Sequence, residues 1–202
     1  MTVIVEPGVY PDITADDPER ARWLAWRRQG IGSSDIAAII GLSPWATPYS
    51  VWAEKSGRYE PDQDTTVTEF GRRAEPMIAP WFTDHTGYHT RKWQHQAIHH
   101  RWPVARATCD ALVYRARRSA APVGVLEMKT TGWQRNWDDL PDKYDAQVQW
   151  QLEVLDLDRG WIAALHGRRL QVYPVDRRPD DGAWLLAKAR EFYDSCRREL
   201  VS

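Results

Sequence analysis

Apolar and polar positions recur with two different periods along this chain, and the periods divide it into helical and extended segments. Pro18 in a first turn, and Gly41 and Gly57 after last turns, are ordinary start and stop signals of helices. Pro76 and Pro80 fall inside the longest early helix and predict a kink there. The predicted helices cover about residues 18–28, 33–40, 48–56, 67–86, 142–157 and 180–200.

Between residues 93 and 130 the pattern changes to short runs typical of strands, namely WQHQAIHH, PVARATCDALVY and VGVLEMKT, with RARRSAAP as a hairpin loop between the last two. WIAALHG and RLQVYPV predict a further strand pair. Residues 1–17 carry no period and are expected to form an extended N-terminal arm, with residues 18–202 as a single domain. The order of elements predicts a mixed α/β (α+β) fold, with a central mixed sheet flanked by helices.

The composition of the 202 residues narrows the class of protein. No run of about 18 apolar residues and no signal-peptide pattern occurs, so a cytoplasmic protein without a membrane partner is expected. Cys109 and Cys196 are too few for a disulfide framework or a four-thiolate zinc site. Cys109 is expected to be a buried thiol, because its neighbour Asp110 would point to the opposite face of a strand.

The charge of the chain neither requires nor excludes nucleic acid. The formal net charge of −1 argues mildly against a protein that binds DNA over its whole surface. Arginine nevertheless supplies most of the cations, and carboxylates that hold metal ions would cancel them in the sum. Solvated surfaces account for most of the arginine doublets, which lie at residues 27–28, 72–73, 117–118, 168–169, 177–178 and 197–198.

Three charged residues of the predicted sheet carry the chemistry. Glu127 and Lys129 lie two positions apart in an apolar strand and therefore share one face, and the predicted hairpin places Asp110 beside Glu127. The two carboxylates would make an oxygen site for a hard divalent cation, with the Met128 carbonyl as a further ligand. Lys129 would stabilise charge that develops on a phosphate. The alternative is a surface ion pair with an unrelated Asp110.

Polar residues on two predicted helices could complete this centre. Glu75 in the long helix could bind a second ion, although its position alone favours an exposed helical glutamate. Tyr144, Gln147 and Gln151 form a stripe on one helix face. Gln147 could then hydrogen-bond the metal-bound water or a phosphate. The alternative is a polar stripe that faces solvent.

A short helix start offers a separate anion site. Ser33 and Ser34 open this helix, and Arg28 lies just upstream, so the three could hold a DNA phosphate. Simple N-capping by the serines is the alternative.

Five ordered blocks resemble the YqaJ-type viral recombinase family, which includes lambda-type phage exonucleases, over roughly residues 20–165. The blocks are GIGSSDIAAIIGLSPWATPYSVWAEKSG, FGRRAEPMIAPWF, ATCDALV, VLEMKT and YDAQVQWQLEVL. The resemblance implies a PD-(D/E)XK restriction-endonuclease-like core.

The family's functional positions can be transferred one by one. The aspartate block here reads T-C-D-A rather than the S-P-D-G or T-P-D-G common in relatives, which puts the phosphate-binding role of Thr108 in doubt. For the 5′-phosphate site, Arg27 and Ser33 are alternatives to Arg28 and Ser34. The resemblance implies that the catalytic and metal residues are Asp110, Glu127, Lys129, Glu75 and Gln147, and that the phosphate-site residues are Arg28, Ser34 and Thr108, with Tyr144 alongside.

The same resemblance implies an activity. We expect an enzyme that uses Mg²⁺ or Mn²⁺, as two ions, to degrade linear double-stranded DNA from its 5′ ends. The 3′ single-stranded tails would serve phage-type homologous recombination with a strand-annealing partner protein in the cytoplasm of a bacterial host. A ring-shaped homo-oligomer, such as a trimer, is expected. The alternatives are an endonuclease with the same metal centre and a non-catalytic DNA-end-binding module.

Overall fold

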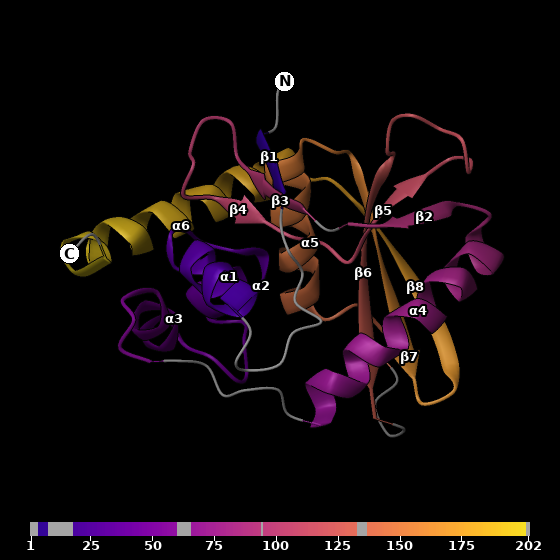
Figure 1. Cartoon of the computed structure of the whole chain (residues 1–202), viewed down its shortest axis with the longest axis horizontal. Coiled ribbons are helices and arrows are strands. Elements are labelled where there is room, and N and C mark those ends of the chain that lie inside the picture. Colours follow the sequence, from indigo (N-terminus) through magenta and orange to yellow (C-terminus); the bar gives the residue numbers. More distant parts are fainter. Residues whose placement is uncertain (1–3, 8–17, 60–65, 94, 133–136, 201–202) are drawn as a thin grey trace.

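The computed structural model describes residues 4–7, 18–59, 66–93, 95–132 and 137–200 (Figure 1). Each predicted helix is present within a few residues of its expected bounds. Helix α4 continues through both Pro76 and Pro80. Residues 8–17 of the predicted arm and residues 201–202 of the predicted domain lie outside the described part. The helices are α1 (Pro18–Arg28), α2 (Ser33–Ile39), α3 (Pro48–Lys55), α4 (Thr66–Thr86), α5 (Asp142–Leu155) and α6 (Pro179–Leu200).

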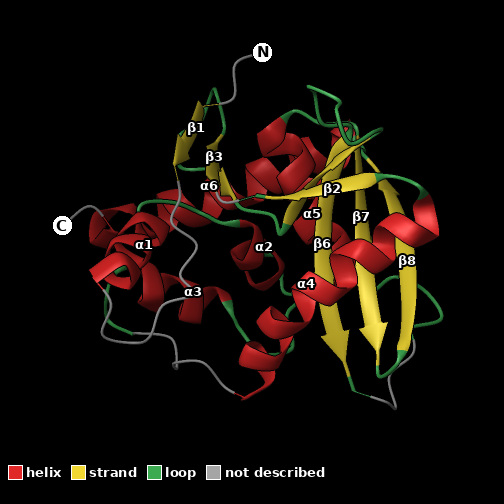
Figure 2. Ribbon diagram, turned by 45° about the vertical axis from the view of Figure 1, so that its right-hand side comes forward, coloured by secondary structure: helices red, strands yellow, loops and turns green. Residues whose placement is uncertain are grey.

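The main sheet has the strand order β2-β5-β6-β7-β8. Strands β6 and β7 are parallel and are joined through α5, while the other neighbours are antiparallel. Figure 2 shows α4 lying across one face of this sheet, with α5 behind it. The sheet is therefore mixed and covered by helices, as expected. Its strands are β2 (His89–Lys92), β5 (Ala111–Tyr114), β6 (Gly124–Thr131), β7 (Arg159–His166) and β8 (Arg169–Asp176).

Two predicted strands have the wrong extent. The segment 93–100 forms a strand only over β3 (His95–Ile98), which belongs to a small sheet with β1 (Ile4–Pro7) and β4 (Arg106–Ala107). Strand β2 of the main sheet, which precedes this segment, was not predicted. The segment 103–114 is also divided, so Asp110 precedes β5 rather than lying in mid-strand. The reason is that the Thr108 carbonyl accepts hydrogen bonds from the side chains of Ser33 and Gln151 instead of a neighbouring strand.

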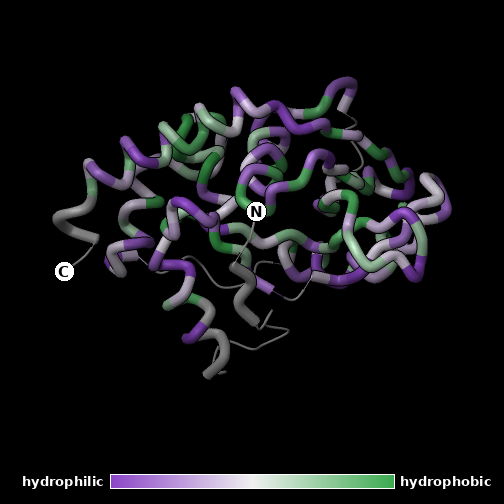
Figure 3. The backbone as a smooth tube through the Cα atoms, turned by 90° about the horizontal axis from the view of Figure 1, so that it is seen from above, coloured by the Kyte–Doolittle hydropathy of each residue, from purple (hydrophilic) through white to green (hydrophobic). Residues whose placement is uncertain are grey.

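Alternation along β6 separates two cores. Val125 packs in the core beneath α5, whereas Leu126 packs with Phe82 of α4 on the opposite face. Glu127 and Lys129 continue the Val125 series and therefore lie on the α5 side. Figure 3 shows hydrophobic and hydrophilic residues interleaved along the chain. Within the described residues, no helix has the length and apolar character needed to cross a membrane.

Candidate active site

Asp110 and Glu127 meet across the β5–β6 hairpin. The register pairs Ala111 with Leu126, so the next step along the two antiparallel strands sets Asp110 against Glu127. The carboxylate of Asp110 accepts a hydrogen bond of 2.6 Å from the backbone N–H of Met128. The hairpin expected from the sequence is thus confirmed, and it brings the two acidic residues together.

The Glu127 carboxylate is buried and accepts three side-chain hydrogen bonds. The ammonium of Lys129 and the amide of Gln147 each lie 2.6 Å from Oε1. The Gln151 amide lies 2.8 Å from Oε2. These donors satisfy a charge whose burial would otherwise be costly. The Glu127–Lys129 pair consequently belongs to a buried polar cluster and not to an exposed sheet edge.

Helix α5 supplies two of these donors. Gln147 and Gln151 are four residues apart and thus face the same way, toward β6. Tyr144 extends the row by one turn, and its ring centroid lies 5.3 Å from the Lys129 ammonium. The polar stripe on this helix therefore points to the carboxylates, and the alternative of a solvent-facing stripe does not hold.

Burial and the charge of Glu127 raise the pKa values of two acidic groups, Asp110 and Glu75. Burial raises the pKa of Asp110 well above its ordinary value, and the charge of Glu127 raises it further. Burial also raises the pKa of Glu75, where Glu127 adds to the shift and Lys92 opposes it. Glu75 is thus near enough for its charge to be felt at the centre. Its position in the sequence alone had favoured an exposed helical glutamate.

Lys129 stays cationic in these surroundings. Burial alone would lower its pKa, but the carboxylates of Glu127 and Asp110 more than compensate, and the pKa of Lys129 is raised. A charged ammonium is therefore held beside the acidic pair.

The oxygen-rich donor set fits a hard divalent cation. Such an ion would stabilise the ionised forms of Asp110 and Glu75, whose pKa values are raised by burial and by the charge of Glu127, and Mg²⁺ and Mn²⁺ favour oxygen ligands. Within the described residues, no three Asp, Glu, His or Cys side chains already form a metal cluster. An ion here would rely on Asp110 and Glu127, completed by the Met128 carbonyl and water, with Glu75 next to them.

A small pocket lies at the start of α2. Its lining includes Arg27, Ser33, Ser34 and Thr108, but Arg28 is absent. Arg27 lies 3.5 Å from the Ser34 hydroxyl and 3.3 Å from the Asp35 carboxylate. The structure therefore places Arg27, rather than Arg28, against Ser34.

The serines are not the N-cap of α2, contrary to the simplest interpretation of the sequence. Gly32 occupies the cap, and its backbone N–H donates to the Asp35 carboxylate at 2.8 Å. Ser33 instead donates its hydroxyl to the Thr108 carbonyl at 3.3 Å, because α2 packs against the segment before β5.

Sequence interpretation missed one polar residue, Lys55, and assigned no role to another, Gln151. Lys55 is buried at the end of α3, and its ammonium lies 2.6 Å from the Asp35 carboxylate in the pocket. No local pattern reveals this contact, since it joins two helices. Gln151 had a signal in its spacing from Gln147, but its link is visible only in the structure: its amide contacts both Glu127 and the Thr108 carbonyl, each at 2.8 Å.

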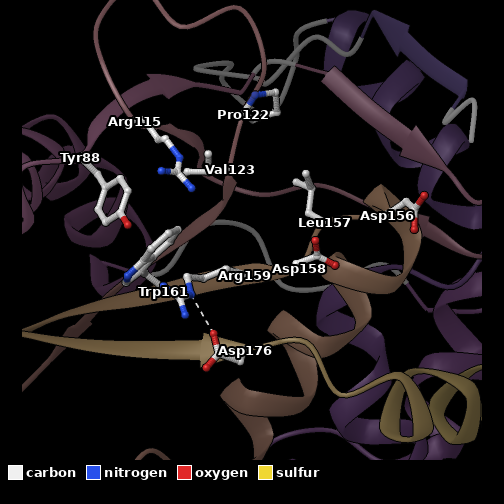
Figure 4. A pocket seen from close by; sticks show the side chains of 10 residues that line it. All are labelled: Tyr88, Arg115, Pro122, Val123, Asp156, Leu157, Asp158, Arg159, Trp161 and Asp176. Atoms are coloured by element: carbon white, nitrogen blue, oxygen red, sulfur yellow. Dashed lines mark hydrogen bonds and ion pairs between the residues drawn. The ribbon is translucent and has the colours of Figure 1, made fainter.

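A larger cavity of about 510 Å³ lies away from this centre, where β6 and β7 begin (Figure 4). Tyr88 and Trp161 form an aromatic wall, with ring centroids 4.9 Å apart. Arg159, which also lines the cavity, forms an ion pair with Asp176 at 2.7 Å. The lining includes none of the residues proposed for catalysis, so size alone does not identify the functional site.

Known proteins share this fold. The alkaline exonuclease LHK-Exo of Laribacter hongkongensis matches with a TM-score of 0.71 and 15% identity over 89% of this chain and 94% of its own. A phage-related exonuclease of Haemophilus somnus 129PT matches with a TM-score of 0.58 and 13% identity over 85% and 93%. The expected PD-(D/E)XK-like fold is confirmed.

Sequence comparison gives the family. The uncharacterized protein YqaJ of Bacillus subtilis is 29% identical over 193 residues, which are 91% of this chain and 59% of that protein. The chain thus spans less than two thirds of its relative's length. Residues 22–158 match the YqaJ-like viral recombinase domain. This match covers more than half of the chain, which therefore belongs to the YqaJ-like viral recombinase domain family.

Proposed function

We propose that this protein is a metal-dependent exonuclease that hydrolyses phosphodiester bonds at the ends of linear double-stranded DNA. The observation that carries the proposal is the Glu127 carboxylate, which faces Asp110 and receives hydrogen bonds from Lys129 and Gln147. Buried carboxylates beside a lysine suit phosphoryl chemistry, because they hold cations near the charge that develops on the phosphate. The fold shared with two exonucleases supports the same proposal.

Each residue has a role in this scheme. Asp110, Glu127 and the Met128 carbonyl would hold one divalent ion, and Glu75 would contribute to a second. When bound, Mg²⁺ or Mn²⁺ supplies Lewis acidity and lowers the pKa of a bound water. Lys129 places its positive charge next to the attacked phosphate, where it stabilises negative charge in the transition state.

Gln147 and Gln151 orient the carboxylate on which this arrangement depends. Gln147 shares Glu127 Oε1 with Lys129, and Gln151 holds the second oxygen. Tyr144 covers the ammonium of Lys129 and limits the directions it can take.

The pocket at α2 supports action at DNA ends. The guanidinium of Arg27, which also contacts Asp35 and Glu54, and the hydroxyl of Ser34 line a pocket that borders Thr108, two residues before Asp110. A terminal 5′-phosphate held there would set the first nucleotide over the carboxylates. Digestion would then run 5′→3′ and leave 3′ tails, as in phage-type recombination. Thr108 also lines this pocket. Arg27, rather than Arg28, would therefore bind the terminal phosphate.

End-labelled linear duplex and closed circular plasmid, each incubated with Mg²⁺, test the proposal. We expect nucleotide release from the linear DNA only, with complete inhibition by EDTA. Lys129→Ala should reduce the rate about 100-fold or more, whereas Lys188→Ala on the exposed face of α6 should not. Cleavage of the circle would indicate an endonuclease. Tight DNA binding without cleavage in any divalent metal would indicate a non-catalytic end-binding module.

Assembly and partners follow from the family resemblance. We propose a ring-shaped homo-oligomer, such as a trimer, acting with a strand-annealing protein in the bacterial cytoplasm. Light scattering after size exclusion measures the assembly, and a monomer at micromolar concentration would contradict the ring.

A further inference from the structure

The loop between β5 and β6 presents two exposed arginines, Arg117 and Arg118, on a braced backbone. Arg91 of β2 donates hydrogen bonds to the carbonyls of Arg117 and Ser119, at 2.9 and 2.8 Å. Its guanidinium lies 3.8 Å from the ring centroid of Tyr114, where β5 ends. These contacts brace the backbone of the loop, and such bracing lowers the entropy cost of binding.

The side chains of this doublet differ from those of several other arginines on the surface. Arg177 binds Glu153 and Asp156, and Arg178 binds Asp145 and Asp181. Arg73 binds Glu69, and Arg27 binds Asp35 and Glu54. Across the described ranges, no carboxylate pairs with the guanidinium of Arg117 or Arg118. Two adjacent cations without internal partners suit an external anion.

The position of the loop relates it to the candidate active site. Thr108 borders the pocket for the terminal phosphate, Asp110 follows at the carboxylate centre, and β5 then runs to Tyr114 and the loop. At about 3.3 Å per residue, the loop begins about 13 Å beyond Asp110. Pocket, carboxylates and arginines thus follow one another along a single chain segment.

The cavity of Figure 4 limits this basic surface on one side. Arg115, the first residue of the loop, points into that cavity, toward the side where Arg159, Asp158 and Asp176 lie. Asp176 there is paired with Arg159, whereas Asp158 adds a negative charge that disfavours a DNA backbone on that side relative to the side of Arg117 and Arg118.

We propose that Arg117 and Arg118 bind backbone phosphates of the uncleaved duplex about four to six base pairs inside its end, since successive phosphates advance about 3.4 Å along the axis. The direction of the strand rests on the proposed function, with the terminal phosphate at Arg27 and Ser34. The contact itself is electrostatic and independent of base sequence.

Fluorescence anisotropy with a 5′-phosphorylated duplex of about 20 base pairs, in EDTA to prevent cleavage, measures this contact. The variant R117Q/R118Q should bind about tenfold more weakly, with a salt dependence reduced by about two phosphate contacts. The matched control R168Q/R169Q removes the same charge from the β7–β8 turn at the opposite end of the sheet. It should change the affinity less than about twofold. Equal losses in both variants would overturn the proposal.

A second duplex locates the contact. Neutral methylphosphonates replace the phosphates about four to six base pairs from the end, on both strands. Wild-type protein should bind this duplex about tenfold more weakly than the unmodified one. R117Q/R118Q should bind both duplexes almost equally, because the two guanidinium groups that would contact these phosphates are already absent. Additive losses would place the arginines elsewhere and overturn the proposal, as would a wild-type protein that does not bind duplex. Binding is measured without cleavage, so a failure of the nuclease assay and a failure here are separate results.

Discussion

The side-chain amide of Gln151 lies 2.8 Å from Glu127 and also 2.8 Å from the carbonyl of Thr108, so one buried group connects the candidate metal centre with the candidate phosphate pocket. Residues that orient a metal-binding carboxylate in this way commonly change metal affinity or activity 10- to 100-fold, by order of magnitude. Gln151 is therefore expected to be a positioning residue.

Gln151→Ala should lower the cleavage rate about 10- to 100-fold and raise the Mg²⁺ concentration needed for half-maximal activity. A purely structural role would leave that Mg²⁺ requirement unchanged. Gln149→Ala is the matched control, because Gln149 is equally buried on α5 but donates to the Asp176 carbonyl. Equal Mg²⁺ requirements in Gln151→Ala and Gln149→Ala would contradict the role proposed for Gln151.

The pocket at α2 predicts a preference for phosphorylated ends. Loss of a charge-assisted hydrogen bond costs about 1.5–3 kcal/mol, or about 10- to 100-fold. Arg27→Ala should therefore remove most of the preference for a 5′-phosphorylated over a 5′-hydroxyl duplex. Arg28→Ala should keep the preference, since Arg28 does not line the pocket. The ratio of rates on the two substrates is insensitive to a general loss of stability. The opposite result would restore Arg28 to the site.

Metal binding should strengthen as the pH rises. The raised pKa of Asp110, caused by burial and then by Glu127, means that its proton is retained to a higher pH than in an ordinary aspartate. A metal ion must displace that proton. The stabilisation of the fold by Mg²⁺ or Mn²⁺, measured as a shift in Tm, should be larger at about pH 8 than at about pH 6. Asp110→Asn should show little shift at either pH. A metal-induced shift that is independent of pH would refute the prediction.

The residues that could be found from sequence are those whose geometry is local. Glu127 and Lys129 share a face because strand residues alternate, and Gln147 and Gln151 share one because helix residues repeat near every fourth position. Asp110 needed only the assumption of a hairpin. In each case the positions within one strand, helix or hairpin determine which side chains lie together.

The phosphate pocket could not be derived in this way. Arg27, Asp35 and Lys55 lie on three different helices, and only the packing of α1, α2 and α3 brings them together. A difference of one position along α1 turns a side chain by about 100°, so sequence alone could not choose Arg27 over Arg28. The strand boundaries around Thr108 failed for a related reason, since distant side chains bind its carbonyl.

The two cysteines should differ sharply in reactivity. Burial raises the pKa of Cys109 well above its ordinary value, and the charges of Asp110 and Glu127 raise it further. The thiolate is the reactive form, so Cys109 should resist alkylation. Cys196 on α6 is partly exposed and should react. Mass spectrometry after brief iodoacetamide treatment should find one modified site in the native protein and two after denaturation. Rapid native labelling of Cys109 would contradict its packing.

The buried ion pair of Asp35 and Lys55 should make stability depend on pH. Burial alone would raise the pKa of Asp35, but the ammonium of Lys55 and the guanidinium of Arg27 overcome it, and the pKa lies below the ordinary value of 3.8. Removing one partner of a buried pair costs about 3–5 kcal/mol. Asp35→Asn should therefore lower the free energy of unfolding by about this amount near neutral pH.

The sign of the pH effect follows from the lowered pKa. The folded state favours the ionised carboxylate, so the stabilisation is complete above the ordinary value of 3.8 and is lost as the pH falls through the lower folded-state pKa. Urea unfolding at several acidic pH values should show wild type and Asp35→Asn converging in that window. The exposed Asp84→Asn should remain within about 0.5 kcal/mol of wild type at neutral pH. A stability difference between wild type and Asp35→Asn that persists unchanged in acid would mean that packing, rather than charge, holds α2 to α3.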